Sequence, residues 1–146
     1  GMMQKDNRTI AFVCTGNTCR SPMAEAIFND MAEKNGVCVR AESFGIATST
    51  GLPVSENSVI ACKEIGIDLS GKASTAVADA GIEKYEKFYC MSQGHAKMLM
   101  QFFLVQPEKI AVLGISDPYG GGIEVYRHCR DEIVNSVKEI LKAYEN

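Results

Sequence analysis

Short apolar segments alternate along the chain with longer segments whose apolar residues recur at helical spacing. The short segments predict strands at residues 8–13, 37–44, 88–91 and 109–113. The periodic segments predict helices at residues 22–35, 54–65, 94–103 and 122–144. Residues 73–81 fit neither pattern clearly and predict a short extra helix or an irregular connection.

This alternation of strands and helices predicts an α/β fold. We expect a three-layer sandwich with a central four-stranded parallel sheet, doubly wound as in flavodoxin-like proteins. The 146 residues, of which 46% are hydrophobic, suit one domain spanning residues 1–146 with a single core. Residues 1–7 are interpreted as a tag scar and an N-terminal extension, because Gly1 precedes Met2.

Charge and composition exclude several classes of function. A net charge of −3 argues against a general nucleic-acid binder. No apolar run approaches the ~18–20 residues of a membrane span, and the sequence shows no secretion signal, so we expect a cytoplasmic protein that does not bind membranes. The six cysteines are irregularly spaced, and the two histidines are isolated. We therefore expect no disulfide framework, no metal and no cofactor, and we interpret His95 and His128 as surface or hydrogen-bonding residues.

The most informative segment is CTGNTCRSP, residues 14–22, between the first predicted strand and the first predicted helix. A helix start offers unpaired N–H donors and the positive end of a dipole, both of which favour an anion. Gly16 permits an unusual backbone angle, and Arg20 can hold two oxygens at once. We therefore expect a phosphate loop after strand 1, formed by Thr15, Gly16, Asn17, Thr18, Cys19, Arg20 and Ser21.

The same surroundings favour the thiolate of Cys14, which makes it a candidate nucleophile. The Ser21 hydroxyl could donate a hydrogen bond to this sulfur. Asp117 follows the fourth predicted strand, and the carboxyl ends of parallel strands share one edge of a sheet. Asp117 can therefore share one site with Cys14 and Arg20.

The motif Cys-x5-Arg-Ser-Pro, continued by Met-Ala-Glu-Ala, resembles the signature of the low-molecular-weight protein tyrosine phosphatase family. Asp117-Pro118-Tyr119 resembles the Asp-Pro-aromatic segment that carries the family's general acid. The likeness extends over essentially the whole chain. It assigns Asn17 to organising the loop, although Lys72 stands where many members have a histidine near it.

The resemblance implies hydrolysis of a phosphorylated protein through a phosphocysteine on Cys14, without a metal. Phosphate or another oxyanion would bind in the active site. The loop sequence, with Thr18 where tyrosine-specific members commonly have a bulkier aliphatic residue, resembles the bacterial protein arginine phosphatases. Those enzymes often have phenylalanine at the position of Tyr119. Thr18 and Tyr119 are expected to line the substrate cleft, with phosphoarginine slightly favoured over phosphotyrosine.

Several alternatives stay open. Cys19 either packs in the core or serves as a redox partner that protects an oxidised Cys14 in a disulfide. The chain could be an arsenate reductase on the same scaffold, although no downstream cysteine pair is evident. It could also be a phosphocysteine carrier protein of a sugar-uptake system, to which an acid/base at Asp117 gives no advantage, or a catalytically silent phosphate-binding module.

Overall fold

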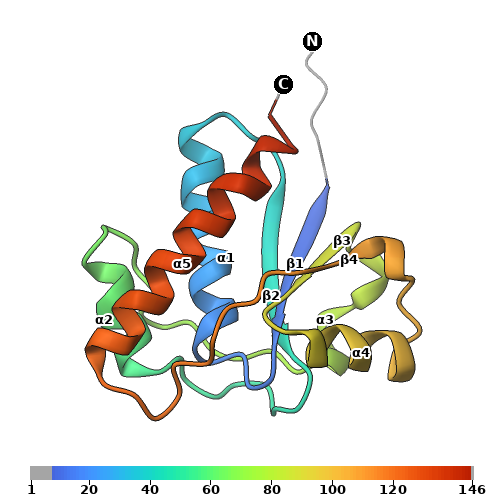
Figure 1. Cartoon of the computed structure of the whole chain (residues 1–146), viewed down its shortest axis with the longest axis horizontal. Coiled ribbons are helices and arrows are strands. Elements are labelled where there is room, and N and C mark those ends of the chain that lie inside the picture. Colours follow the sequence, from blue (N-terminus) through green and yellow to red (C-terminus); the bar gives the residue numbers. More distant parts are fainter. Residues whose placement is uncertain (1–7, 146) are drawn as a thin grey trace.

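The computed structural model describes residues 8–145, which form a parallel sheet between two layers of helices (Figure 1). The interpretation of residues 1–7 lies outside this range. The strands are β1 (Thr9–Cys14), β2 (Arg40–Gly45), β3 (Lys87–Cys90) and β4 (Ile110–Val112). The helices are α1 (Arg20–Lys34), α2 (Glu56–Lys63), α3 (Val77–Ala80), α4 (Gln93–Phe102) and α5 (Ile123–Lys142), with 3-10 turns η1 (Ile82–Lys84) and η2 (Pro107–Lys109).

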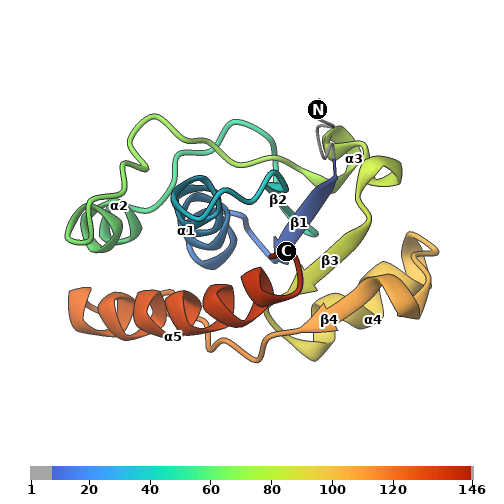
Figure 2. The same ribbon diagram turned by 90° about the horizontal axis from the view of Figure 1, so that it is seen from above.

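The four strands lie in the order β2-β1-β3-β4, and every pair is parallel. Viewed from above, α1, α2 and α5 cover one face of the sheet, whereas α3 and α4 lie on the other (Figure 2). This arrangement confirms the predicted α/β fold with a central four-stranded parallel sheet.

The central strand β1 divides the core into two parts, because successive side chains of a strand point to opposite faces. Ile10 and Phe12 pack among residues of α1 and α5. Ala11 and Val13 pack on the opposite face, among residues of α3 and α4. All four are completely buried, so β1 is fixed from both sides and delivers Cys14 to the edge of the sheet in a defined position.

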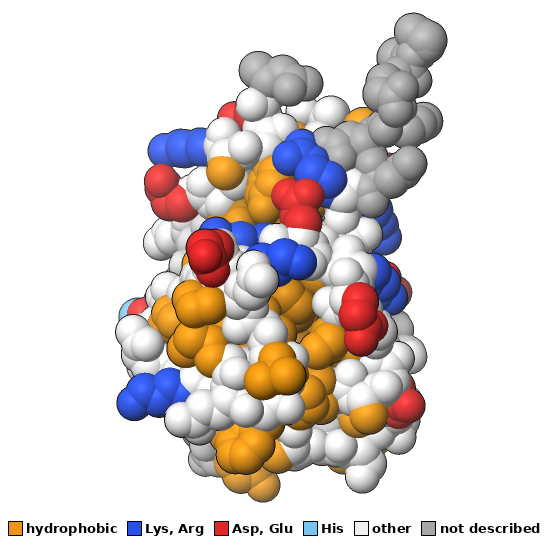
Figure 3. All heavy atoms as spheres, turned by 90° about the vertical axis from the view of Figure 1, so that its right-hand side faces the viewer, with side chains coloured by type: hydrophobic (Ala, Val, Ile, Leu, Met, Phe, Trp, Pro, Cys, Tyr) orange, Lys and Arg blue, Asp and Glu red, His pale blue; other side chains and the backbone are white. Residues whose placement is uncertain are grey.

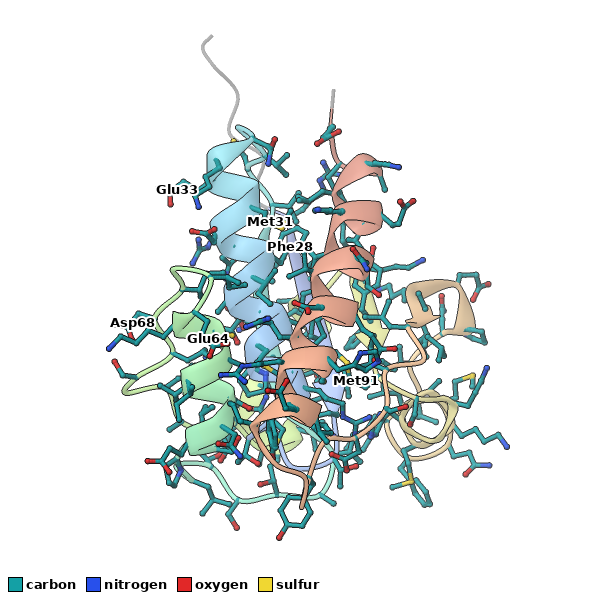
Figure 4. All side chains as sticks on the ribbon, turned by 60° about the vertical axis from the view of Figure 1, so that its left-hand side comes forward. Phe28, Met31, Glu33, Glu64, Asp68 and Met91 are labelled. Carbon is teal, nitrogen blue, oxygen red and sulfur yellow. The ribbon has the colours of Figure 1, made fainter. Side chains whose placement is uncertain are left out.

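Helix α5 closes the first layer with an apolar stripe at helical spacing. Its buried residues are Tyr126, Cys129, Ile133, Val137, Ile140 and Leu141. Glu64, labelled in Figure 4, follows α2. It accepts hydrogen bonds from Arg127 at 2.7 Å and from Arg130 at 2.8 Å. These bonds, chiefly that from Arg127, lower the pKa of Glu64 to about 2. These hydrogen bonds link α2 to α5. They therefore also help to fix the segment before α2, which lies beside the predicted phosphate loop.

The ends of several elements differ from the sequence-based prediction. Residues 37–39 precede β2 instead of belonging to it. Helix α2 begins later than predicted because the Ser55 side chain accepts the N–H of Ser58, which caps the helix at this point. In the uncertain segment 73–81, the short helix α3 ends at Gly81, whose φ of +70° favours glycine.

Hydrophobic side chains gather on the face formed by α4 and the turn after it (Figure 3). Among them, Phe102 and Leu104 are 65% and 82% exposed. Within residues 8–145, no helix combines the length and hydropathy that crossing a bilayer requires.

Candidate active site

The site lies at the carboxyl edge of the sheet, in a cleft of about 250 Å³. One wall is the loop between the end of β1 and the start of α1, and the other is the segment between β4 and α5. The lining residues are Cys14, Thr15, Gly16, Asn17, Thr18, Cys19, Arg20, Asp117 and Tyr119. The structure therefore brings together the two segments that the sequence places about 100 residues apart.

The first part of the loop is held by the chain that follows β2. The carbonyls of Cys14 and Thr15 accept hydrogen bonds from the N–H groups of Ile46 and Ala47, each at 3.0 Å. Gly45 makes this close approach possible: a Cβ atom there would lie 2.7 Å from the Thr15 carbonyl oxygen. A larger residue at Gly45 would push the loop out of place.

The sulfur of Cys14 receives two hydrogen bonds inside the fold. The Ser21 Oγ lies 2.7 Å from Sγ, and the N–H of Asn17 donates to Sγ at 3.2 Å. Both contacts suit a thiolate, because hydrogen bonds to the charged form stabilise it. As predicted, Ser21 interacts with the nucleophile. Ser21 is completely buried and does not line the cleft, and its part in binding phosphate stays a prediction.

The side chain of Asn17 organises the loop. Its Nδ2 donates to Ser21 Oγ at 2.8 Å and to Ser43 Oγ at 3.0 Å, while its Oδ1 accepts the N–H of Thr75 at 2.7 Å. Because Ser21 accepts from Asn17, its own proton is available for Cys14. Asn17 also adopts a φ of +56°, a left-handed conformation that asparagine tolerates better than most residues.

Lys72 supports this network indirectly. Ser43 donates to Glu25 Oε1 at 2.6 Å, and the Lys72 ammonium donates to Glu25 Oε2 at 2.8 Å. A continuous chain of contacts therefore runs from Lys72 through Glu25, Ser43 and Asn17 to the loop. Lysine in place of histidine at position 72 changes the group at the far end of this chain of contacts. Asn17 still makes its hydrogen bonds to Ser21, Ser43 and Thr75.

Arg20 and Asp117 face each other across the cleft. Arg20 is 6% exposed, and its Nη1 donates to the Ile115 carbonyl at 2.8 Å. Its Nη2 lies 3.8 Å from Asp117 Oδ2, in a side chain that is 56% exposed. A buried guanidinium and an accessible carboxyl group thus line the same cleft as Cys14, which is an arrangement able to bind an oxyanion and to transfer a proton.

Thr18 and Tyr119 are among the residues that line the cleft, and their contact with a substrate stays a prediction. The backbone of Thr18 is fixed because its carbonyl accepts the N–H of Ser55 at 2.8 Å. Tyr119, by contrast, is 81% exposed. Thr18 is therefore a fixed part of the cleft wall, whereas Tyr119 stands at the mouth.

Cys19 packs in a small cluster with Ala61 and Tyr126. Its Sγ lies 3.4 Å from the Tyr126 hydroxyl and 3.6 Å from Ser55 Oγ. Burial, together with Cys19, raises the pKa of Tyr126 to about 12, so this phenol keeps its proton at neutral pH. The packing role weighed for Cys19 is present in the structure, and its redox role stays a prediction.

His95 is a residue at the loop that the sequence analysis did not connect with the site. Its Nε2 lies 2.9 Å from Thr15 Oγ1. As predicted, both histidines are surface or hydrogen-bonding residues: His128 is exposed and lies near Glu132. The sequence contained one signal for the link between His95 and the site, namely its position: His95 follows β3, which is a neighbour of β1 in the sheet. Within residues 8–145, no three histidine, cysteine or acidic side chains gather in a way that could hold a metal.

The comparisons with known proteins agree with this geometry. Residues 9–146 match the family model described as low molecular weight phosphotyrosine protein phosphatase. The chain belongs to this family. It is 32% identical over 142 residues to a protein-arginine-phosphatase of Bacillus subtilis, covering 91% of this chain and 94% of that protein.

Solved structures of family members also superpose closely. An arginine phosphatase mutant with a phosphorylated active-site serine has a TM-score of 0.87 and 31% identity, covering 92% of this chain and 94% of that one. A low molecular weight protein tyrosine phosphatase from T. tengcongensis has a TM-score of 0.88 and 31% identity, covering 94% and 99%. The family members that resemble this chain thus include arginine phosphatases as well as tyrosine phosphatases.

Proposed function

We propose that this protein removes phosphoryl groups from phosphoarginine side chains of proteins, with phosphotyrosine as the alternative substrate class. The observation that carries the proposal is the single cleft that holds the Cys14 sulfur, the Arg20 guanidinium and the Asp117 carboxyl group. Nucleophile, anion clamp and proton donor are the three parts that cysteine-dependent dephosphorylation needs.

The first step is attack of the Cys14 thiolate on phosphorus. The S–P bond forms as the bond to the leaving nitrogen or oxygen breaks, and Asp117 gives its proton to that leaving atom. Arg20 and the N–H groups of the loop hold the phosphoryl oxygens. Their charge interactions are strong because the loop is already folded around the anion position and need not reorganise.

The second step is hydrolysis of the phosphocysteine. The carboxylate of Asp117, which has lost its proton in the first step, now takes a proton from water. The water oxygen bonds to phosphorus, the S–P bond breaks, and the electron pair returns to Cys14. Ser21 stabilises the departing thiolate through the 2.7 Å contact between Oγ and Sγ.

Thr18 supports arginine as the substrate residue. Its short polar side chain lies in the cleft, where a planar guanidinium needs space and a hydrogen-bond partner. A branched aliphatic side chain would fill that space and leave a polar N–H of the substrate unpaired, which is unfavourable in a buried site. The similarity to protein arginine phosphatases over most of the chain supports the same assignment.

The Thr18→Ile variant tests the substrate class. We expect phosphoarginine hydrolysis to fall much more than phosphotyrosine hydrolysis, shifting the ratio of kcat/KM values by about tenfold or more, or about 1.4 kcal/mol. Thr9→Ile is the matched control, because Thr9 lies at the opposite end of β1 from the loop and does not line the cleft. An unchanged ratio in Thr18→Ile, or a wild-type protein inert toward phosphoarginine peptides, would favour phosphotyrosine instead.

The other functions receive less support. An arsenate reductase would need further reactive thiols to relay a disulfide, but burial raises the pKa values of Cys62, Cys90 and Cys129 to about 12. Such buried thiols react poorly. A phosphocysteine carrier must keep its phosphoryl group, whereas Asp117 stands where it can activate water. A silent binding module would hydrolyse no p-nitrophenyl phosphate.

Cys19 is proposed as the redox partner of Cys14, in a cytoplasm that otherwise keeps both thiols reduced. Hydrogen peroxide would oxidise Cys14 to a sulfenic acid; attack by Cys19 on that sulfur would form the S–S bond and release hydroxide. Mild peroxide should therefore inactivate the wild type reversibly, with thiol reductant restoring activity. Cys19→Ser should instead progress to irreversible loss, and equal recovery of both proteins would leave Cys19 with its packing role alone.

A further inference from the structure

His95 connects helix α4 with the first residue of the phosphate loop. It is 7% exposed and is the third residue of the helix. On one side its ring contacts Ser92, the N-cap of α4, and on the other it contacts Thr15, which lines the cleft directly after Cys14. Because β1 and β3 are neighbours in the sheet, this contact joins two adjacent strand ends.

The hydrogen bonds at Ser92 fix which ring nitrogen carries the proton. The backbone N–H of Ser92 donates to Nδ1 at 3.1 Å, so Nδ1 must be an acceptor. Ser92 Oγ lies 3.0 Å from the same nitrogen and accepts from the backbone N–H of His95 in the capping box. The proton of the neutral ring is therefore on Nε2, which donates to Thr15 Oγ1 at 2.9 Å.

The surroundings keep this ring neutral. Burial is the main cause and the Arg20 guanidinium the second, and together they lower the pKa of His95 to about 4, against a smaller opposing effect of Asp117. A charged ring would carry a proton on Nδ1, which would face the N–H of Ser92. One hydrogen-bonding pattern thus holds across the neutral pH range.

The direction of this bond determines what Thr15 can do. Its hydroxyl accepts from His95, so the hydroxyl proton is not used in that contact. Within residues 8–145, the Thr15 side chain has no second hydrogen-bond partner, and it faces the cleft. The backbone of Thr15 is also fixed, since its carbonyl is held by Ala47.

We propose that His95 is a positioning residue of the active site, which acts through Thr15. The Ser92–His95–Thr15 chain anchors the loop at the residue after the nucleophile and turns the Thr15 hydroxyl proton toward the bound phosphoryl group. This inference rests on the proposed phosphatase function. The Ser92–His95–Thr15 chain is a second support of the loop, on the side opposite Asn17 and its partners.

Two substitutions separate this role from helix capping. In His95→Asn, the shorter side chain keeps an acceptor near the Nδ1 position for Ser92 but does not reach Thr15. In His95→Gln, the longer amide can place an N–H near the Nε2 position and donate to Thr15, while the acceptor for Ser92 is lost. A purely structural role predicts that activity follows thermal stability in both variants.

We expect His95→Asn to lower kcat/KM for p-nitrophenyl phosphate about tenfold, the usual effect of losing one hydrogen bond at a site, and to raise the Kd for inorganic phosphate. His95→Gln should recover most of this loss even though its Tm falls further. His128→Asn, at the exposed histidine of α5, is the control and should change neither quantity.

A double-mutant cycle with Thr15→Val makes the inference sharper. If His95 acts through Thr15, Thr15→Val and the double variant Thr15→Val/His95→Asn should lose activity equally, about tenfold, whereas independent effects would multiply to about a hundredfold. Independent effects, or wild-type phosphate affinity and kcat/KM in His95→Asn, would overturn the inference. If the wild type hydrolyses no phosphate ester, the proposed function fails, while the phosphate Kd values still report on the coupling.

Discussion

The two walls of the cleft are held in different ways. Two side chains of the phosphate loop are closed to solvent, since Asn17 is 1% exposed and Ser21 is 0% exposed. The Asn17 side chain also bonds to Ser43 of β2 and to Thr75 in the segment before α3. The acid segment has mainly local bonds, from Tyr119 N–H to Asp117 Oδ1 and from Gly121 N–H to the Pro118 carbonyl. Arg20 contacts this segment at two points: its Nη1 donates to the Ile115 carbonyl at 2.8 Å, and its Nη2 lies 3.8 Å from Asp117 Oδ2.

This difference assigns distinct tasks to the two walls. A preformed loop can stabilise the transition state because its donors are already aligned when charge shifts toward the oxygens. A proton donor must instead approach leaving groups of different size and later reach a water molecule, which suits an exposed side chain on a sparsely bonded segment. Substitutions in the loop should therefore affect folding and chemistry together, and those in the acid segment chemistry alone.

The largest effect is expected for Cys14→Ser. A serine hydroxyl is a far weaker nucleophile than a thiolate at neutral pH, so turnover should fall below detection. The loop donors and Arg20 remain, so inorganic phosphate should still bind. Steady-state assays and calorimetric titration measure the two properties, and turnover close to that of the wild type would exclude the covalent mechanism.

Asp117→Asn should come second. For substrates whose leaving group needs a proton, kcat should fall by roughly 10²–10⁴. The loss should be smaller for p-nitrophenyl phosphate, because p-nitrophenolate leaves without protonation. Urea denaturation should give unchanged stability, since Asp117 is half exposed. Equal losses with both kinds of substrate would assign Asp117 a structural role.

Substitutions in the two walls should also differ in their effect on the stability of the protein. Asn17→Ala removes the hydrogen bonds to Ser21, Ser43 and Thr75 and places alanine at a φ of +56°. Its free energy of unfolding should fall by about 2–4 kcal/mol. Tyr119→Ala, on the exposed acid segment, should change it by less than about 0.5 kcal/mol. Similar values from urea denaturation of the two variants would contradict the comparison.

Much of the site could be predicted from the sequence because its signals are local. Cys14, Arg20 and Asp117 each follow a recognisable strand, and the rule that parallel strands share a carboxyl edge joins them. The residues that were missed act over long range. Glu25 reaches Asn17 through Ser43, and His95 reaches Thr15 across a strand boundary, so neither pairing leaves a pattern along the chain.

The fold shows the same limit. Alternating apolar and periodic segments predicted the order of strands and helices correctly. The start of β2 involves a long-range contact, whereas the start of α2 depends on the local Ser55 cap, an N-cap signal that the prediction did not use. Ala41 at the beginning of β2 exchanges backbone hydrogen bonds with the Asn29 side chain of α1, and Ser55 caps α2 beside Cys19.

The smallest expected effect is a change of stability with pH, which arises from His95 on the loop side of the cleft. His95 has a pKa of about 4 in the fold, against about 6.5 in an unfolded chain. Below pH 6.5 the unfolded chain therefore binds more protons, and stability decreases as the pH falls.

Between pH 7 and pH 5, His95 should account for a loss of about 2 kcal/mol in the free energy of unfolding. Urea denaturation at both pH values measures this loss, and His95→Asn should remove it. The low pKa of Glu64 matters only at more acidic pH, because its stabilisation is lost below about 4.5. Equal losses in the wild type and His95→Asn would show that the ring is not held neutral.

The central claim is that the phosphoryl group passes through Cys14. The Asp117→Asn variant suits this test best. Phosphocysteine can still form in it, because p-nitrophenolate leaves without a proton from Asp117. Hydrolysis of the phosphocysteine is slowed, because the carboxylate that takes a proton from water is missing. Acid quenching during turnover of p-nitrophenyl phosphate, followed by peptide mass spectrometry, should find a phosphoryl adduct on the peptide that contains Cys14, at close to one per active site. Turnover with no protein-bound phosphoryl group, or an adduct on another residue, would contradict the account.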